Sequence, residues 1–217
     1  MKKIGLNYLL FAVFIISAAF TSCDKNPEDN NGNGNGNEKE WVEISGVKWA
    51  TCNVDKPGTF AAKSENAGMF YQWNRKTGWS STDPLVNHEG GTTWDSSISE
   101  GDSWEKANNP CPTGWRVPTL EEQQSLLAAG SEWATLNGFK GRYFGSGEHT
   151  VFFPAAGGRF NDDGTLLYVD TIGFYCSSSP DNSDCTFALG FGNEEEGIWV
   201  SEAYRRQDAF SVRCVRE

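Results

Sequence analysis

Apolar and polar residues alternate in two short segments, Trp41–Ile44 and Val47–Ala50. Alternation with a period of two is typical of a strand that buries one face. Gly46 stands between the two segments and signals a turn. The pattern therefore predicts two strands joined by a turn at the start of a folded domain.

The clearest helical pattern spans residues 119–129. Thr119 can accept a hydrogen bond at the start, and Glu122 three residues later completes the pattern of a capping box. Gly130 can end the helix in a left-handed conformation. The residues expected to face the core are Leu120, Leu126 and Leu127.

Most of the remaining chain predicts short strands and long turns. The strand candidates are 139–144, 150–156, 165–169, 172–178, 185–191, 197–200 and 210–215. Residues 161–164 (Asn-Asp-Asp-Gly) form a hairpin turn signal, in which Gly164 can take a positive φ. Residues 55–110 show little periodicity and predict an irregular region, with one helical turn near 104–108. The predicted class is α+β, with one or two helices packed on antiparallel strands and long loops.

The first 22 residues have the layout of a secretory signal: Lys2 and Lys3, a short apolar core at Leu9–Ile16, then small residues. The segment ends in Ala-Phe-Thr-Ser before Cys23, which resembles the lipobox of bacterial lipoproteins. That resemblance implies cleavage before Cys23 and attachment of fatty acyl chains such as palmitate, and two or more chains anchor a protein stably. The alternative is an ordinary signal peptide with a cysteine nearby by chance.

Residues 23–40 are rich in Asn, Gly and acidic residues and contain almost nothing apolar. Such a segment buries too little surface to offset its ordering entropy, so it predicts a flexible tether before a domain at 41–217. The acidic residues Asp24, Glu28 and Asp29 resemble the signal that sends Bacteroidota lipoproteins to the outer face of the outer membrane. The expected location is therefore the outer membrane, with the periplasm as the alternative.

The net charge limits the partners. Removal of residues 1–22 takes away two lysines and no acidic residue, which changes the formal charge from −11 to −13. An acidic surface repels phosphate groups, so nucleic acid and anionic lipid headgroups are not expected to bind the domain.

Five cysteines remain after Cys23, and an exported compartment permits disulfides. Cys176 and Cys185 flank the turn signal Pro180-Asp181-Asn182, and we predict a disulfide between them across a hairpin. A further pair is expected among Cys52, Cys111 and Cys214, and the sequence does not choose among these three. Because the number is odd, at least one thiol stays free or pairs outside the chain. The cysteines and histidines lack the close spacing of a zinc site, so we predict no bound metal and no cofactor.

Four ordered blocks resemble one known family, the Fibrobacter succinogenes major paralogous domain. They are Val47–Val54 (VKWATCNV), Cys111–Thr119 (CPTGWRVPT), Phe153–Arg159 with Gly173–Ser179 (FPAAGGR and GFYCSSS), and Phe210–Val215 (FSVRCV). The resemblance covers about residues 46–216. It implies a fold similar to that of C-type lectins, shared with the formylglycine-generating sulfatase modifiers, on surface or secreted proteins of generally unassigned function. Cys176 stands where this family more often has tryptophan.

The residues offer little catalytic chemistry. His88 and His149 lie in polar, glycine-rich surroundings, and no nucleophile elbow accompanies them. The calcium-binding motifs of sugar-binding C-type lectins and the second reactive cysteine of the sulfatase modifiers are missing. The acidic run Asn193–Glu196 is typical of a solvated face, with cation binding as the alternative. We therefore predict that the protein is not an enzyme.

Aromatic residues are concentrated in the irregular region. They are Phe70, Tyr71, Trp73, Trp79, Trp94 and Trp104. Rings on surface loops serve recognition, and we predict that Trp79 and Trp94 are an exposed pair that binds a ligand. The alternative is that these rings pack the loops together.

The leading hypothesis is a surface-exposed lipoprotein whose lectin-like domain recognises a glycan or a cell-surface protein. The alternatives are a structural or assembly component of the envelope, and an enzyme related to the sulfatase modifiers. Exposure of Trp79 and Trp94 favours recognition, and their burial favours the structural role.

Overall fold

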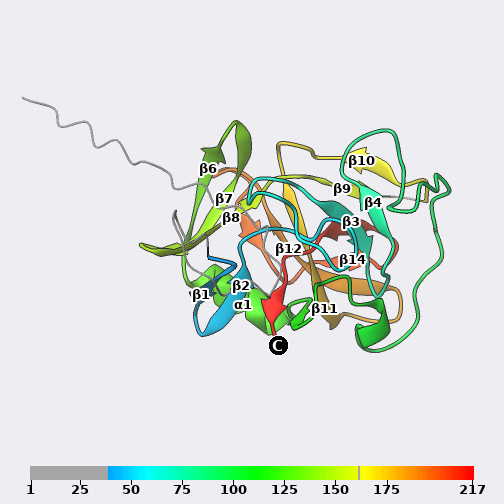
Figure 1. Cartoon of the computed structure of the whole chain (residues 1–217), viewed down its shortest axis with the longest axis horizontal. Coiled ribbons are helices and arrows are strands. Elements are labelled where there is room, and N and C mark those ends of the chain that lie inside the picture. Colours follow the sequence, from blue (N-terminus) through cyan, green and yellow to red (C-terminus); the bar gives the residue numbers. More distant parts are fainter. Residues whose placement is uncertain (1–38, 161) are drawn as a thin grey trace, which may run out of the picture.

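The computed structural model describes residues 39–160 and 162–217, which fold into three β-sheets and one α-helix (Figure 1). The predicted signal peptide, the lipid attachment at Cys23 and nearly all of the tether 23–40 lie outside the described residues. In the described part of the chain, no helix is long and apolar enough to cross a membrane. The α+β class predicted from the pattern agrees with this arrangement.

The two ends of the described chain meet in one sheet. Its strands, in spatial order, are β1 (Trp41–Ile44), β2 (Val47–Ala50), β16 (Val215–Arg216) and β5 (Trp115–Arg116). Ser45 and Gly46, with φ of 51° and 79°, turn the chain between β1 and β2. The two predicted strands and the turn at Gly46 are confirmed. Figure 1 shows the C-terminus beside this sheet and the helix.

The largest sheet holds β3 and β4 together with most strands of the second half of the chain. Its strands are β3 (Met69–Gln72), β4 (Gly78–Ser80), β9 (Gly158–Phe160), β10 (Thr165–Leu167), β11 (Gly173–Pro180), β12 (Cys185–Phe191), β13 (Ile198–Trp199), β14 (Ala203–Arg205) and β15 (Ala209–Ser211). The central strand β15 pairs with β3 and β9 antiparallel and with β11 parallel. The expectation of antiparallel strands is therefore met except at β11 and β15. The predicted turn before Thr165 is confirmed, with Gly164 at φ 71°.

The third sheet is a meander of β6 (Ser131–Leu136), β7 (Phe139–Ser146) and β8 (His149–Pro154). After the helix, the first predicted strand began at residue 139, so β6 was missed. The strands β3, β4, β5, β9 and β14 were also missed, and one strand was predicted at 210–215. The structure divides that segment between β15 and β16, which belong to different sheets.

The helix α1 (Leu120–Ala128) begins as predicted. The Thr119 side chain accepts a hydrogen bond from the backbone N–H of Glu122, and the Glu122 carboxylate accepts one from the Thr119 N–H at 2.8 Å. Leu126 is fully buried, and Gln123 is buried beside it, where its amide donates to the carbonyl oxygens of β11. A polar residue thus anchors the helix to the largest sheet.

Buried arginines hold the long loops in place. Arg159 donates to the carbonyl oxygens of Ser80 and Thr82, each at 2.7 Å, and Arg206 donates to those of Ser99 and Gly101 at 2.9 and 2.8 Å. Neither side chain is more than 2% exposed. Each guanidinium therefore supplies the hydrogen bonds that an irregular backbone cannot make with itself.

Arg213 does the same where the sheets meet. Its guanidinium donates to the carbonyl oxygens of Ala50 and Phe152 at 3.2 and 3.0 Å and to the Asn53 side chain at 2.8 Å. It also lies over the Phe153 ring, 4.5 Å from the centroid. Burial lowers the pKa of Arg213 to about 10, which leaves the guanidinium charged at neutral pH.

The structure confirms the predicted pair among Cys52, Cys111 and Cys214 and contradicts the predicted pair of Cys176 with Cys185. Cys111 and Cys214 form a disulfide with a Cα–Cα distance of 6.1 Å, whereas Cys176 and Cys185 are free. The hairpin register explains the difference, because Cys176 lies opposite Ala188 and points into the core. Cys185 lies at the start of β12 and is partly exposed, so the two thiols are not cross-strand neighbours.

Candidate ligand-binding site

Trp79 and Trp94 do not form the exposed pair that we predicted. Trp79 lies in β4 and is only 1% exposed, and Trp94 is half-buried. Their ring centroids lie 4.9 Å apart, and Trp94 covers the backbone of Gly164 so closely that a side chain there would clash with the indole. The prediction of exposure is wrong for Trp79, because a β-strand carries its ring to the inner side of the largest sheet. The two rings pack the loop against that sheet.

A pocket of about 310 Å³ lies elsewhere, around Trp104. Segments far apart in the sequence form its wall: the loop 103–109, the strand β5 with the start of α1, the strand β11 and the last residue. The lining residues are Ser103, Trp104, Lys106, Asn109, Arg116, Val117, Thr119, Ser178 and Glu217. We call this cavity the Trp104 pocket. Its volume is within the range of small-molecule sites.

The loop that carries Trp104 is held by hydrogen bonds to fixed parts of the fold. The buried Asn74 accepts from the Glu105 N–H at 2.8 Å and donates to the Glu100 carbonyl oxygen at 3.1 Å. The Trp104 indole N–H donates to the carbonyl oxygen of Asn108 at 3.0 Å in the short 3₁₀ helix η1 (Lys106–Asn108). The ring is therefore already oriented without a ligand.

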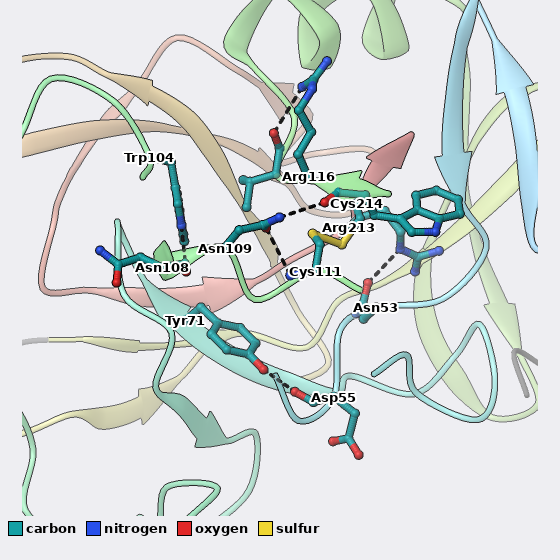
Figure 2. The surroundings of a disulfide bond; sticks show 12 residues. Asn53, Asp55, Tyr71, Trp104, Asn108, Asn109, Cys111, Arg116, Arg213 and Cys214 are labelled. Atoms are coloured by element: carbon teal, nitrogen blue, oxygen red, sulfur yellow. Dashed lines mark hydrogen bonds between the residues drawn. A yellow bond between two sulfur atoms is a disulfide. The ribbon is translucent and has the colours of Figure 1, made fainter. Parts of the chain in front are cut away.

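The disulfide lies directly behind the same wall (Figure 2). Asn109 donates through its amide to the Trp115 carbonyl oxygen at 2.7 Å and accepts from the Cys111 N–H at 3.1 Å. Cys111 is in turn bonded to Cys214, three residues before Glu217. Two walls of the pocket are thus covalently connected.

Arg116 gives the pocket its best-defined charge. Its guanidinium forms a two-fold hydrogen bond with the Glu122 carboxylate, at 2.6 and 2.8 Å. This bond raises the pKa of Arg116. Partial burial acts to raise the pKa of Glu122, but the hydrogen bonds from Arg116 and the Thr119 N–H outweigh it, and the pKa lies below its usual range. Both groups are charged at neutral pH, and they fix each other in position.

Other polar groups at the wall are uncommitted. Among the described residues, no hydrogen bond or ion pair occupies the Ser178 hydroxyl, the Lys106 ammonium or the Glu217 carboxylate. The pocket therefore combines one fixed indole ring with hydroxyl, ammonium and carboxylate groups free to contact a ligand. The sequence had marked Trp104 only as one aromatic among six. It gave no ligand-binding signal for Lys106 or Ser178, which come from separate segments.

A second, larger groove of about 860 Å³ follows the edge strand β1 and reaches His149. It borders Lys39, where the described chain begins, and its lining residues come mainly from β1 and from the ends of β7 and β8. Its lining comes mostly from one continuous segment, residues 39–46, whereas four separate segments line the Trp104 pocket.

The other candidate groups are arranged as parts of the structure. His88 accepts a hydrogen bond from the Gly78 N–H at 3.2 Å, and His149 is exposed on the β7–β8 turn. Burial raises the pKa of the Cys176 thiol to about 12, which keeps it protonated and unreactive. Among the described residues, no group of His, Cys, Asp and Glu side chains is arranged to hold a metal ion.

The acidic run 193–196 is a capped turn. The Asn193 side chain accepts from the N–H groups of Glu195 and Glu196, and the Glu196 carboxylate accepts from the Asn193 N–H. Glu194 pairs with the buried Arg142 at 3.3 Å. The carboxylates of this acidic run therefore stabilise the loop and the buried guanidinium of Arg142.

Comparison with known proteins found no match to this chain among family models, curated proteins or solved structures.

Proposed function

We propose that the domain is a non-catalytic recognition module that binds a glycan unit in the Trp104 pocket outside the cell. The observation that carries this proposal is the fixed indole of Trp104, surrounded by uncommitted polar groups in a preformed cavity. A sugar ring presents an apolar face that stacks on an indole and hydroxyl groups that hydrogen-bond around its edge. We include in the proposal the C-type-lectin-like fold, the membership of the Fibrobacter succinogenes major paralogous domain family, and lipid anchoring at Cys23 in the outer membrane.

Glycan binding can be measured on an array of glycans, followed by titration of the best-bound sugar with the full chain. Trp104→Ala is expected to weaken binding by at least about tenfold, because stacking of a nucleic-acid base on an aromatic side chain contributes about 1–3 kcal/mol and we take the same scale for a sugar ring. Ser178→Tyr, which fills the pocket, is expected to have a similar effect.

Trp41→Ala is the matched control, because Trp41 is also half-buried but lines the groove beside β1. Binding that survives Trp104→Ala and is lost with Trp41→Ala would move the site to that groove. An array without any binding would contradict glycan recognition.

A structural or assembly role in the envelope is the second candidate. The burial of Trp79 favours it, since rings that pack loops are not free for a ligand. The recognition role and the structural role both include lipid anchoring at Cys23, which can be tested separately. Cys23→Ser is expected to release the protein from membranes into the soluble fraction, and a variant that stays with membranes would contradict lipidation.

A further inference from the structure

One side of the largest sheet carries a continuous cluster of aromatic rings. The cluster consists of Phe160, Tyr168, Phe174, Trp199, Tyr204 and Phe210. The rings of Phe174 and Phe210 stack with their centroids 5.1 Å apart, and both side chains are buried. We call the outer part of this cluster, together with Val169, the aromatic face. The aromatic face shares no residue with the lining of the Trp104 pocket.

The outer rings are open to solvent to different extents. Phe160, Trp199 and Tyr204 are half-buried, whereas Tyr168 is 50% exposed and Val169 is 45% exposed. Large apolar side chains exposed next to one another are uncommon on a soluble surface and mark a site of interaction. An isolated exposed residue would not carry this meaning.

Tyr168 is presented by a stiff turn. Its backbone has φ of 63°, which is unusual for a residue with a side chain. Its carbonyl oxygen accepts hydrogen bonds from the N–H groups of Thr171 and Ile172 at 3.1 and 3.0 Å. The ring packs 5.6 Å from that of Phe160. A partner that contacts Tyr168 therefore loses little conformational entropy on the protein side.

Acidic residues lie close to these rings along the chain. Asp170 lies two residues after Tyr168, and Glu202 approaches the Tyr204 hydroxyl, which donates to the carboxylate at 3.5 Å. Neither carboxylate forms an ion pair with a described residue. Arg205, the cation of the same strand as Tyr204, is already engaged by Asp162 and Asp208, at 3.2 and 3.6 Å. The local charge is therefore negative.

We propose that the aromatic face binds a cationic polypeptide segment, rich in lysine or arginine, of a partner protein. The ring faces carry negative potential and attract ammonium and guanidinium groups, while the Glu202 carboxylate at Tyr204, and Asp170 in the turn after Tyr168, add negative charge to this part of the chain. The acidic balance of the whole chain adds long-range attraction for such a partner. The same charge disfavours a second copy of this chain and an anionic membrane, and a neutral sugar would gain nothing from the long-range attraction.

The test is a titration of the full chain into a short fluorescent peptide of alternating lysine and glycine, followed by fluorescence anisotropy. A peptide with glutamate in place of lysine controls for charge. Tyr168→Ala is expected to weaken binding by about tenfold, and Glu202→Gln by about threefold. Tyr168→Phe is expected to bind like the wild type, because the ring and not the hydroxyl contacts the cation.

Phe139→Ala and Glu132→Gln are the matched controls. Phe139 is 45% exposed and Glu132 is exposed, and both lie on the β6–β7 hairpin in another sheet. Both variants are expected to bind the lysine peptide as the wild type does. Unchanged binding in Tyr168→Ala would show attraction by net charge alone, and equal losses in Tyr168→Ala and Phe139→Ala would show binding to any exposed ring; either result would overturn the proposal. Absence of binding to the lysine peptide, or equal binding to the glutamate peptide, would overturn it as well.

Discussion

Removal of the disulfide between Cys111 and Cys214 is expected to cost a large share of the domain's stability. The two cysteines are separated by 103 residues, more than half of the described chain. A cross-link over a loop of that length removes unfolded-state entropy worth about 4.7 kcal/mol at room temperature in the chain-entropy description. Domains of this size have unfolding free energies of about 5–15 kcal/mol. The variant Cys111→Ala with Cys214→Ala should therefore approach the limit of folding.

The measurement is urea unfolding followed by tryptophan fluorescence without reductant, so that other cysteines keep their state. We expect the midpoint to fall and the slope of unfolding free energy against urea to rise. The slope rises because an unfolded chain without the cross-link exposes more surface to the denaturant. Both changes trace to the unfolded state and not to a lost contact in the folded one.

Packing must be separated from cross-linking, since Cys214 is fully buried. Cys176→Ala is the matched control, because Cys176 is also buried but has a free thiol. It reports the cost of removing one buried sulfur, which we expect to be about 1 kcal/mol. If the double variant lost no more than twice that amount and kept its slope, the entropic reasoning would be refuted.

Three further predictions follow from individual side chains. An alkylating reagent at neutral pH is expected to modify Cys185 in the folded protein. Cys176 should stay unmodified until the protein unfolds, because burial raises the pKa of its thiol to about 12. Peptide mapping by mass spectrometry checks both results. Because the folded-state pKa of Glu122 lies below its usual 4.5, its stabilising effect is present above about pH 4.5 and is lost as the pH falls further. Glu122→Gln should lower the free energy of unfolding by about 1 kcal/mol at neutral pH and make the melting temperature depend less on pH below about 4.5. A melting temperature that still falls with acid as in the wild type would contradict this prediction. Arg213→Lys should destabilise the fold by about 3 kcal/mol in chemical denaturation, because one ammonium group cannot reach all the buried carbonyl oxygens, whereas the exposed Arg205→Lys should have little effect.

Local elements were the most predictable part of this fold. The capping pattern of Thr119 and Glu122 predicted where α1 begins, because the hydrogen bonds of a helix start connect residues three positions apart. The turns at Gly46 and Gly164 were predictable for the same reason, since a positive φ is a property of one residue. These features depend only on neighbours along the chain.

The strands β3 and β4 were not predicted because they are short and are buried on both faces, so apolar and polar residues do not alternate along them. Met69–Gln72 is almost entirely buried, so no polar face marks it as a strand. The loops around these strands are ordered by Arg159 and Arg206, which reach carbonyl oxygens dozens of residues away. Nothing in the local pattern of residues 55–110 encodes those contacts.

The cysteine pairing shows the same limit. Spacing and a turn signal favoured Cys176 with Cys185, yet a pairing across a hairpin depends on the register, and the register set Ala188 opposite Cys176. Cys111 and Cys214 meet because β5 and β16 are neighbours in one sheet. A neighbour relation between strands a hundred residues apart is a property of the topology.

The sequence by itself determined the acidic balance, the local turns and the start of the helix, and it predicted an N-terminal targeting segment, a polar tether and one α+β domain. Only the tertiary structure decided which aromatic rings are buried, since Trp79 lies inside while Tyr168 lies outside. It also assembled the Trp104 pocket from four separate segments. The physical reason is that composition and periodicity report contacts between near neighbours, whereas burial and pockets arise from contacts between segments that folding brings together.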